Sequence, residues 1–188
     1  MNFSTAFGYE IVGGMSSSDI DEPVSLSQWQ GDWPLRFSAE CRRLVGSLDV
    51  GPEDLRHIGS TSVPGMLAKP VVDIMLGIPQ WPPVERLTHG LESLGYDSFG
   101  EGNVPGRYYF RLRSAHEFNV HVVQRDGAHW INNLALRDYL RRSPSACERY
   151  AAAKLGAYES GARSLLAYSA AKADVVGQLL REALAKRG

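Results

Sequence analysis

The sequence has few cysteines and no long apolar run. Its 188 residues include two cysteines, Cys41 and Cys147, which lie far apart and form no Cys-X-X-Cys pair. This spacing argues against a disulfide scaffold and against a thiolate zinc site. No stretch approaches the roughly 20 consecutive apolar residues of a membrane helix, and no basic start followed by an apolar run suggests a signal peptide. We therefore expect a soluble, cytoplasmic protein with no membrane partner.

The composition is that of an ordinary globular protein, with 44% hydrophobic and 22% charged residues. The net charge of −1 conceals an asymmetry: residues 1–98 hold 6 Lys/Arg against 13 Asp/Glu, a balance of −7, whereas residues 99–188 hold 14 against 8, a balance of +6. Because the chain as a whole is not basic, a nucleic-acid partner is not expected. The basic half can instead face an anionic ligand, or simply the acidic half.

Apolar periodicity predicts a mixture of strands and helices. Strands are expected at 55–58, 71–78, 107–113 and 118–124, with a short edge strand at 23–28. Helices are expected at 35–48, 84–94, 132–143, 144–158 and 163–186. Because helices alone fill the end of the chain, we expect an α+β fold, in which a mixed β-sheet has flanking helices and a C-terminal helical bundle.

The length fits one domain, which we divide into three parts. Residues 1–22 are rich in glycine and serine and are expected to form a flexible N-terminal tail. Residues 23–126 form the α/β core, and residues 127–188 form a helical part packed on that core. The sequence predicts no oligomeric state.

The most informative stretch runs from His57 to Asp73, HIGSTSVPGMLAKPVVD, where a Gly-Ser turn lies between two predicted strands. Small residues after a strand let backbone N–H groups approach a phosphate. Three hydroxyls of the turn can add donors, those of Ser60, Thr61 and Ser62. The GxxxxGK[ST] pattern of a P-loop is absent. The stretch fits a phosphate cradle or a purely structural turn.

Three polar residues fall within apolar strands. Asp73 lies in VVDIML, and Asn119 and His121 share one face of FNVHVV. A charged group in a buried strand is costly unless it is paired or binds a metal, so these residues and His57 are candidates for a site. The alternative is a strand-end aspartate and histidines satisfied by backbone carbonyls.

Basic residues recur on the predicted strands and helices of the second half. Arg107, Arg111 and Arg113 share one strand face and suit a phosphate or carboxylate, unless that face is simply solvated. The pairs Tyr150/Lys154 and Tyr168/Lys172 are each four residues apart and share a helix face, and Arg137 lies near Tyr139. The alternative for these helical residues is that each cation simply packs beside its neighbouring tyrosine on the protein surface.

The stretch HIGSTSVPGMLAKPVVDI resembles the GrpB-like family, also called UPF0157, which has a nucleotidyltransferase fold. Further similar pieces follow the family's order along residues 23–184. They are Trp33-Pro34, NVHVV at 119–123, Trp130 followed by LALRDYLRRSP, and the two YxxxK elements that begin at Tyr150 and Tyr168.

The resemblance implies a Gly59-Ser60 turn followed by Asp73 as the first of three metal-binding carboxylates. In nucleotidyltransferases these carboxylates hold a divalent metal that bridges the nucleotide phosphates. The second position is Met75, and the third falls on the strand of Asn119 and His121, where no residue is acidic. One carboxylate with a histidine and an amide suits a softer metal than Mg²⁺, or no metal.

Three hypotheses for the function follow. The first is a nucleotidyltransferase-like enzyme that binds a nucleotide or another phosphorylated small molecule in a cleft between sheet and helices, with a divalent metal on Asp73 if one is used. The second is acid–base chemistry on a small metabolite by His57, Asp73 and His121. The third is a non-catalytic binding module. The expected substrate-binding residues are Gly59, Ser60, Thr61, Ser62, Lys69, Arg107, Arg111, Asn119, Arg137, Lys154 and Lys172.

Overall fold

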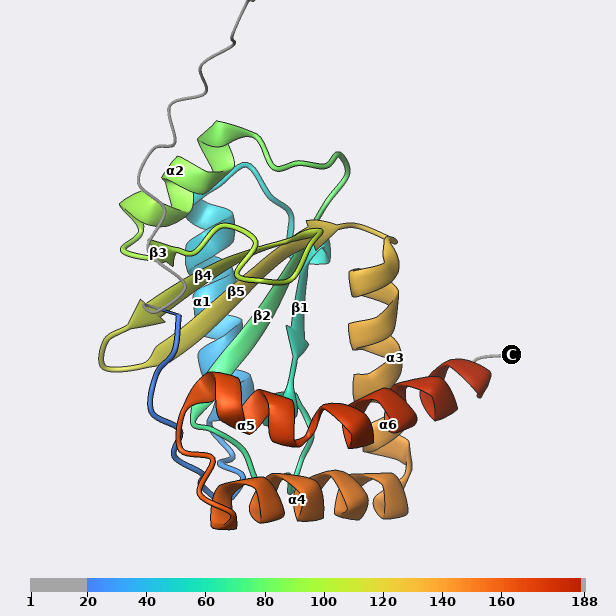
Figure 1. Cartoon of the computed structure of the whole chain (residues 1–188). Coiled ribbons are helices and arrows are strands. Elements are labelled where there is room, and N and C mark those ends of the chain that lie inside the picture. The colour runs from blue at the N-terminus through green and yellow to red at the C-terminus, as the bar shows by residue number, and fades with distance from the viewer. Residues whose placement is uncertain (1–19, 187–188) are drawn as a thin grey trace, which may run out of the picture.

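The computed structural model describes residues 20–186 and contains a five-stranded mixed sheet (Figure 1). The strands are β1 (Leu55–Ile58), β2 (Val71–Ile78), β3 (Asp97–Ser98), β4 (Arg107–Arg113) and β5 (Glu117–Gln124). Their order across the sheet is β1-β2-β5-β4-β3. β2 and β5 are parallel, and every other neighbouring pair is antiparallel. The four longer strands lie within a residue of the predicted ranges, while β3 was not predicted because two residues are too few for a periodic pattern.

The strand β2 divides its side chains between two different environments, as alternation requires. Val72, Ile74 and Leu76 point into the main hydrophobic core and are at most 1% exposed. On the opposite face, Met75 packs in a smaller core with Trp130, whereas Asp73 lines a cavity. The site therefore lies on the sheet face opposite the main core.

Two helices cover the core face of the sheet. They are α1 (Trp33–Ser47) and α2 (Glu85–Ser93). In α1 a proline occupies the first turn, where no intrahelical N–H is needed, and Trp33 and Leu44 are completely buried against the sheet. In α2, Leu87 and Leu91 are spaced by four residues and enter the same core.

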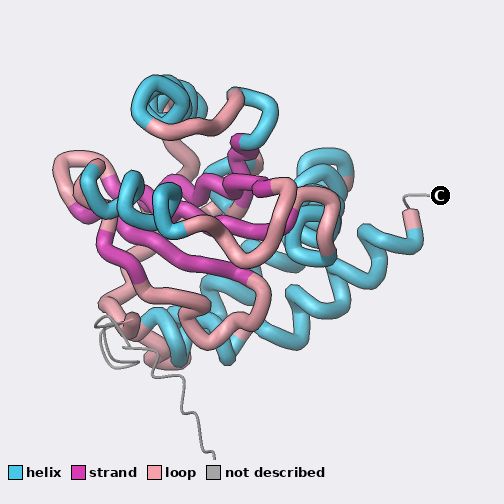
Figure 2. Tube along the Cα trace, turned by 90° about the horizontal axis from the view of Figure 1, so that it is seen from above, coloured by secondary structure: helices cyan, strands magenta, loops and turns pink. Residues whose placement is uncertain are grey.

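The remaining helices follow β5 and lie toward the other face and the end of the sheet. They are α3 (Ala128–Arg142), α4 (Pro144–Glu159), α5 (Leu165–Ala171) and α6 (Ala173–Ala185). In Figure 1, α3 runs beside β1, while α4, α5 and α6 lie together beyond the lower end of β1 and β2. Figure 2 shows helical segments on both sides of the strands. Their shared core includes Tyr139, Ala146 and Leu179.

The described chain begins within the segment expected to form the tail. Residues 1–19 of the expected tail lie outside the described residues, but Ile20 is only 5% exposed and Glu22 pairs with Arg113. The edge strand expected at 23–28 is wrong. That segment makes isolated bridges from Pro23 to Ser164 and from Ser27 to Ala68, because its backbone links α5 to the loop before β2 instead of the sheet.

The last predicted helix, 163–186, is two helices. Lys172 lies between α5 and α6 with φ −108° and ψ 2°, which is not helical geometry. Since alanine and leucine favour helix on both sides, the sequence pattern contains no sign of this break. The helix expected from residue 132 begins earlier, at Ala128.

The architecture is α+β, as predicted, with a mixed sheet and a C-terminal group of helices. Within residues 20–186, no helix has the length and apolar character needed to cross a membrane.

Candidate functional site

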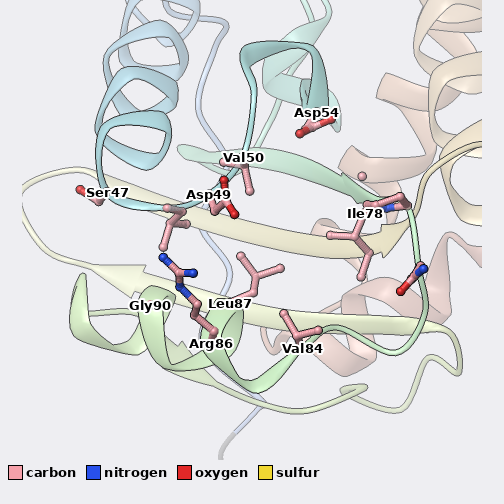
Figure 3. Close-up of a pocket in the computed structure, with 13 residues that line it drawn as sticks. Ser47, Asp49, Val50, Asp54, Ile78, Val84, Arg86, Leu87 and Gly90 are labelled. Atoms are coloured by element: carbon pink, nitrogen blue, oxygen red, sulfur yellow. The ribbon is translucent and has the colours of Figure 1, made fainter.

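Two cavities of about 450 Å³ each lie on opposite sides of the sheet. The first, drawn in Figure 3, lies between the end of α1 and the helix α2, and its wall includes Val50, Val84 and Leu87. None of the predicted site residues lines it. The second lies at the Gly-Ser turn, between β2, β4, β5 and the helices α4 and α5.

The second cavity gathers ten of the fourteen predicted site residues. They are Gly59, Ser60, Thr61, Lys69, Asp73, Arg107, Asn119, His121, Lys154 and Lys172. They come from both halves of the chain, since the acidic half supplies the turn and Asp73 and the basic half supplies the strand and helix cations. We therefore take this cavity as the candidate site.

Asp73 is the centre of the polar network at the bottom of the cavity. The parallel register pairs Asp73 with Asn119 and Met75 with His121, which places the three polar side chains on one face. Asn119 Nδ2 donates to Asp73 Oδ1 at 2.7 Å, and His121 Nε2 lies 3.1 Å from the same oxygen. Burial alone would raise the pKa of Asp73, but the contacts with His121, Lys69 and Asn119 outweigh it and bring this pKa to about 2. Asp73 is therefore a carboxylate at neutral pH.

The Gly-Ser turn lies directly against Asp73. Ile58 pairs with Asp73 across β1 and β2, so the residue after the strand, Gly59, passes over the carboxylate. Gly59 has φ +67°, in the left-handed region that favours glycine. The chain then forms the short 3-10 helix η2 (Ser60–Ser62), in which Ser62 Oγ donates to the Gly59 carbonyl at 2.6 Å.

Lys154 comes from α4 and reaches the turn from the other side of the cavity. Its Nζ donates to Ser60 Oγ at 2.5 Å and to the Leu67 carbonyl at 2.7 Å, and lies 4.2 Å from the centre of the Tyr150 ring. The side chain is buried, with 2% of the residue exposed. Burial, with a smaller effect from Lys172, lowers the pKa of Lys154 to about 7.

Three further cations line the cavity. Lys69 lies 3.8 Å from Glu22, Arg107 stacks 4.7 Å above the Tyr109 ring, and Lys172 lies 5.1 Å from the Tyr168 ring. Burial is the largest cause of a lowered pKa for each of these groups. The fold therefore solvates the charged forms of these three side chains less well than water does.

His57 is the main misplaced candidate. Its Nε2 lies 3.0 Å from Thr61 Oγ1 and its ring stacks on Phe37 at 4.8 Å, so that it lies beneath the turn and does not line the cavity. Burial lowers the pKa of His57 to about 4. In β1, His57 pairs with Ile74, whose side chain enters the main core, so His57 points away from the cavity because neighbouring strand side chains alternate.

Three other predicted ligands also lie outside the cavity. Arg111 donates to the Ile20 carbonyl and to Tyr109 Oη. Arg137 donates to Asp138 and to the His57 carbonyl. The Ser62 hydroxyl donates to the Gly59 carbonyl within the turn. Arg113, from the predicted arginine face, is held by Glu22 and by Asn119 Oδ1. These side chains brace the site and do not line it.

Sequence reasoning missed several residues that line the cavity. Tyr109 stands between Arg107 and Arg111 on β4, and that alternation was available in the sequence. The segment from Gly102 to Val104 was signalled only by three glycines within seven residues. Ile20 fell in the expected tail and had no signal at all.

The side chains of this cavity do not fit the metal site of a nucleotidyltransferase. Met75 is completely buried, and Asp73 Oδ1 already accepts from Asn119 while it contacts His121. Among residues 20–186, no group of three or more His, Cys, Asp or Glu side chains is arranged to hold a metal. Mg²⁺ prefers several oxygen ligands, and the donor set here supplies too few.

Comparison with known proteins agrees with this arrangement of elements. The family model described as GrpB protein matches residues 23–182. A UPF0157 protein of Pseudomonas aeruginosa is 33% identical over 174 residues, which cover 90% of this chain and 71% of that protein. A UPF0157 protein of Streptomyces coelicolor is 32% identical over 167 residues, covering 89% and 86%.

A solved structure is similar over most of the fold. The crystal structure of the conserved protein GrpB from Enterococcus faecalis has a TM-score of 0.75 and 30% sequence identity, and the match covers 86% of this chain and 98% of that chain. The family model spans the turn, the Asp73 strand and the helices that supply the lysines. The chain belongs to the GrpB family, also called UPF0157.

Proposed function

We propose that the cavity at the Gly-Ser turn binds a phosphorylated small molecule, with nucleotides as the first class to test, and that the chain is a nucleotidyltransferase-like enzyme acting on it. One observation carries the proposal. Among the described residues that line the cavity, four are lysine or arginine and Asp73 is the only carboxylate. Such a surplus of buried positive charge is unfavourable until an anion enters.

The lowered pKa values of the cavity lysines support this reading. Burial is the largest cause for Lys69, Lys154 and Lys172, and the charge of a neighbouring lysine lowers the pKa of both Lys154 and Lys172 further. A phosphate group among these ammonium groups would supply the missing negative charge. In this proposal, lysines and Arg107 neutralise the phosphates in place of a divalent metal.

Direct binding measurements test the proposal. Isothermal titration with ATP, GTP, CTP, UTP and inorganic pyrophosphate, each with and without Mg²⁺, should give binding of at least one ligand without metal. Adenosine, which lacks phosphate, is the control and should bind at least about tenfold more weakly than ATP. If none of the five phosphate ligands binds, or if binding occurs only with Mg²⁺, the proposal is wrong.

A second candidate is acid–base chemistry on a small metabolite. The specific observation is the contact of 3.1 Å between His121 Nε2 and Asp73 Oδ1, a pairing that orients an imidazole for proton transfer. His57 contributes to this candidate only through the turn, since it lies outside the cavity. Retention of activity on an identified substrate in both Asp73→Asn and His121→Ala would exclude it. Binding without turnover would indicate a binding module instead.

A further inference from the structure

Ser60 and Lys154 form a close pair at the wall of the cavity. The two residues are 94 positions apart, yet Ser60 Oγ and Lys154 Nζ lie 2.5 Å apart. Ser60 stands at the start of η2, where it lines the cavity and is partly exposed, whereas Lys154 is 2% exposed behind it. A ligand in the cavity can therefore reach the hydroxyl, while the amine is shielded from solvent.

The surroundings of Lys154 favour an amine that can take up a proton. Within residues 20–186, no carboxylate forms an ion pair with Lys154. The groups that influence its charge are Lys172 at the end of α5, which opposes it, and Cys147 on α4 and Asp73 on β2, which favour it. Burial is larger than any of these effects and brings the pKa of Lys154 to about 7. A substantial fraction of Lys154 is therefore neutral near pH 7.

The hydrogen bonds around the pair are consistent with proton transfer. A neutral amine can donate to the Leu67 carbonyl, 2.7 Å away, while its lone pair accepts the Ser60 hydroxyl proton. Tyr150 lines the same cavity and interacts with Ser60 and, because burial raises the pKa of Tyr150 to about 12, its hydroxyl stays protonated and is able to donate to Ser60 Oγ. Ser60 thus has one partner that takes its proton and one that stabilises its oxygen.

We propose that Ser60 is a nucleophile and Lys154 its general base, so that the cavity can attack carboxylic esters. This goes beyond the proposed binding of phosphate. An ester is favoured over a phosphate as the reacting group because it is uncharged at the carbonyl. A phosphate placed next to Lys154 would stabilise the ammonium form and remove the base.

The step balances without any other reactant than water. Ser60 Oγ bonds to the carbonyl carbon while its proton moves to Lys154 Nζ, and Lys172, which lines the same cavity, supplies a positive charge that favours the oxyanion. The carbon–oxygen bond to the leaving alcohol then breaks, and Lys154 returns the proton to that oxygen. Water then attacks the acyl carbon and gives a proton to Lys154 Nζ. The bond between that carbon and Ser60 Oγ breaks, Lys154 returns the proton to Ser60 Oγ, and the carboxylic acid leaves.

The test uses p-nitrophenyl acetate as the ester and the full chain as it is. We expect a rapid burst of p-nitrophenolate that approaches one equivalent of protein, and an acetyl group on the peptide of Ser60 by mass spectrometry. Ser60→Ala and Lys154→Met should each lower the burst rate at least about a hundredfold, in the range of lost general-base catalysis. The matched control is Ser145→Ala, an exposed serine of α4 that does not line the cavity, which should keep the burst.

Two further measurements test the role of Lys154 even if Lys154→Met folds poorly. Lys154→Arg retains a cation but has no base, so it should also lose the burst. In the unmodified chain, the acylation rate should rise with pH and level off above about 7. Acetyl found on Lys154 rather than Ser60, a burst that survives Ser60→Ala, or the absence of any burst would each overturn the proposal. Phosphate binding is measured separately and can hold or fail independently of these results.

Discussion

Gly59 and Asp73 are in such close contact that a Cβ added at Gly59 would lie 2.3 Å from Asp73 Oδ2. The two residues belong to the turn after β1 and to the neighbouring strand β2. Because the carboxylate fills the space beneath the turn, the position of the turn depends on Asp73 and the orientation of Asp73 depends on the turn. The phosphate cradle proposed for this turn and the central carboxylate are thus a single structural unit.

The substitution Gly59→Ala should destabilise the fold and weaken ligand binding, for two separable reasons. Gly59 has φ +67°, which costs a residue with a Cβ about 1–2 kcal/mol. The clash of the added Cβ with the Asp73 carboxylate destabilises the fold further. Gly65 is the matched control, since it has φ +77° but no heavy atom within 4 Å of an added Cβ. We expect Gly65→Ala to lower the free energy of unfolding only by the backbone contribution, as measured by urea unfolding. Its affinity for pyrophosphate, measured by titration calorimetry, should be unchanged.

Equal losses of stability in the two alanine variants, with ligand binding retained in both, would contradict this account. It would mean that Asp73 moves aside freely. A crystal structure of Gly59→Ala would show the same result directly as a change of the Asp73 side chain.

The ionised Asp73 carboxylate should contribute to the free energy of unfolding, and this contribution should be lost in acid. Its pKa of about 2 in the fold lies below its ordinary value of 3.8. Since the unfolded chain binds the proton more readily, the stabilisation is full above pH 4 and disappears as the pH falls from 4 to 2. It amounts to about 2 kcal/mol. The difference in unfolding free energy between the unmodified chain and Asp73→Asn should shrink over this range, and a difference independent of pH would be evidence against the network around Asp73.

The sequence predicted the sheet and much of the site because both rest on local patterns. Strand alternation placed Asn119 and His121 on one face correctly, since the period of two is fixed by the backbone, whereas the parallel register that brings Asp73 to that face could not be read from alternation. It could not reveal how Lys154 and Ser60 meet, because their contact joins positions 94 residues apart. Nor could it show that Arg111 is used within the fold, since its partner is the carbonyl of Ile20, and backbone groups carry no residue-specific signal.

Lys172 should be a direct determinant of anion affinity. It lines the cavity from the junction of α5 and α6, and replacing it with methionine removes one charge while keeping the length of the side chain. We expect Lys172→Met to weaken pyrophosphate binding about tenfold, the value of one charge-assisted contact. Lys186 is the matched control because it also lies beside a tyrosine ring, at 4.8 Å from that of Tyr139, but outside the cavity.

Lys186→Met should therefore bind pyrophosphate with unchanged affinity. If both variants lose affinity to the same extent, the effect comes from the overall charge of the helical half rather than from the cavity. Raising the salt concentration separates the two cases, because exposed charges are screened more strongly than buried ones.

Anion binding should become weaker as Lys154 loses its proton. With a pKa of about 7, Lys154 is largely charged at pH 6 and largely neutral at pH 8.5. An anion favours the charged form, so the affinity for pyrophosphate should fall over this interval by about tenfold more than it does in Lys154→Met. The variant controls for the titration of pyrophosphate itself. Identical pH profiles in the two proteins would show that Lys154 does not contact the anion.

His57 shows how a residue of the motif can act without entering the cavity. It supports the turn through its bond to Thr61 and its stacking on Phe37. The sequence identified it correctly as a buried polar residue next to the turn, but burial of an imidazole is compatible with catalysis and with support alike. Only the position of its ring, outside the cavity, distinguishes the two roles.

The replacement His57→Phe should therefore change the acid sensitivity of the fold. Burial holds the pKa of His57 at about 4, below its ordinary value of 6.5. The unfolded chain takes up the proton first as the pH falls, so the unmodified protein should lose about 3 kcal/mol between pH 6.5 and pH 4 through this residue. In His57→Phe this loss should be absent, while His89→Phe, at an exposed histidine, should retain it. Urea unfolding at both pH values measures the difference, and an unaltered acid sensitivity in His57→Phe would mean that His57 is protonated in the fold.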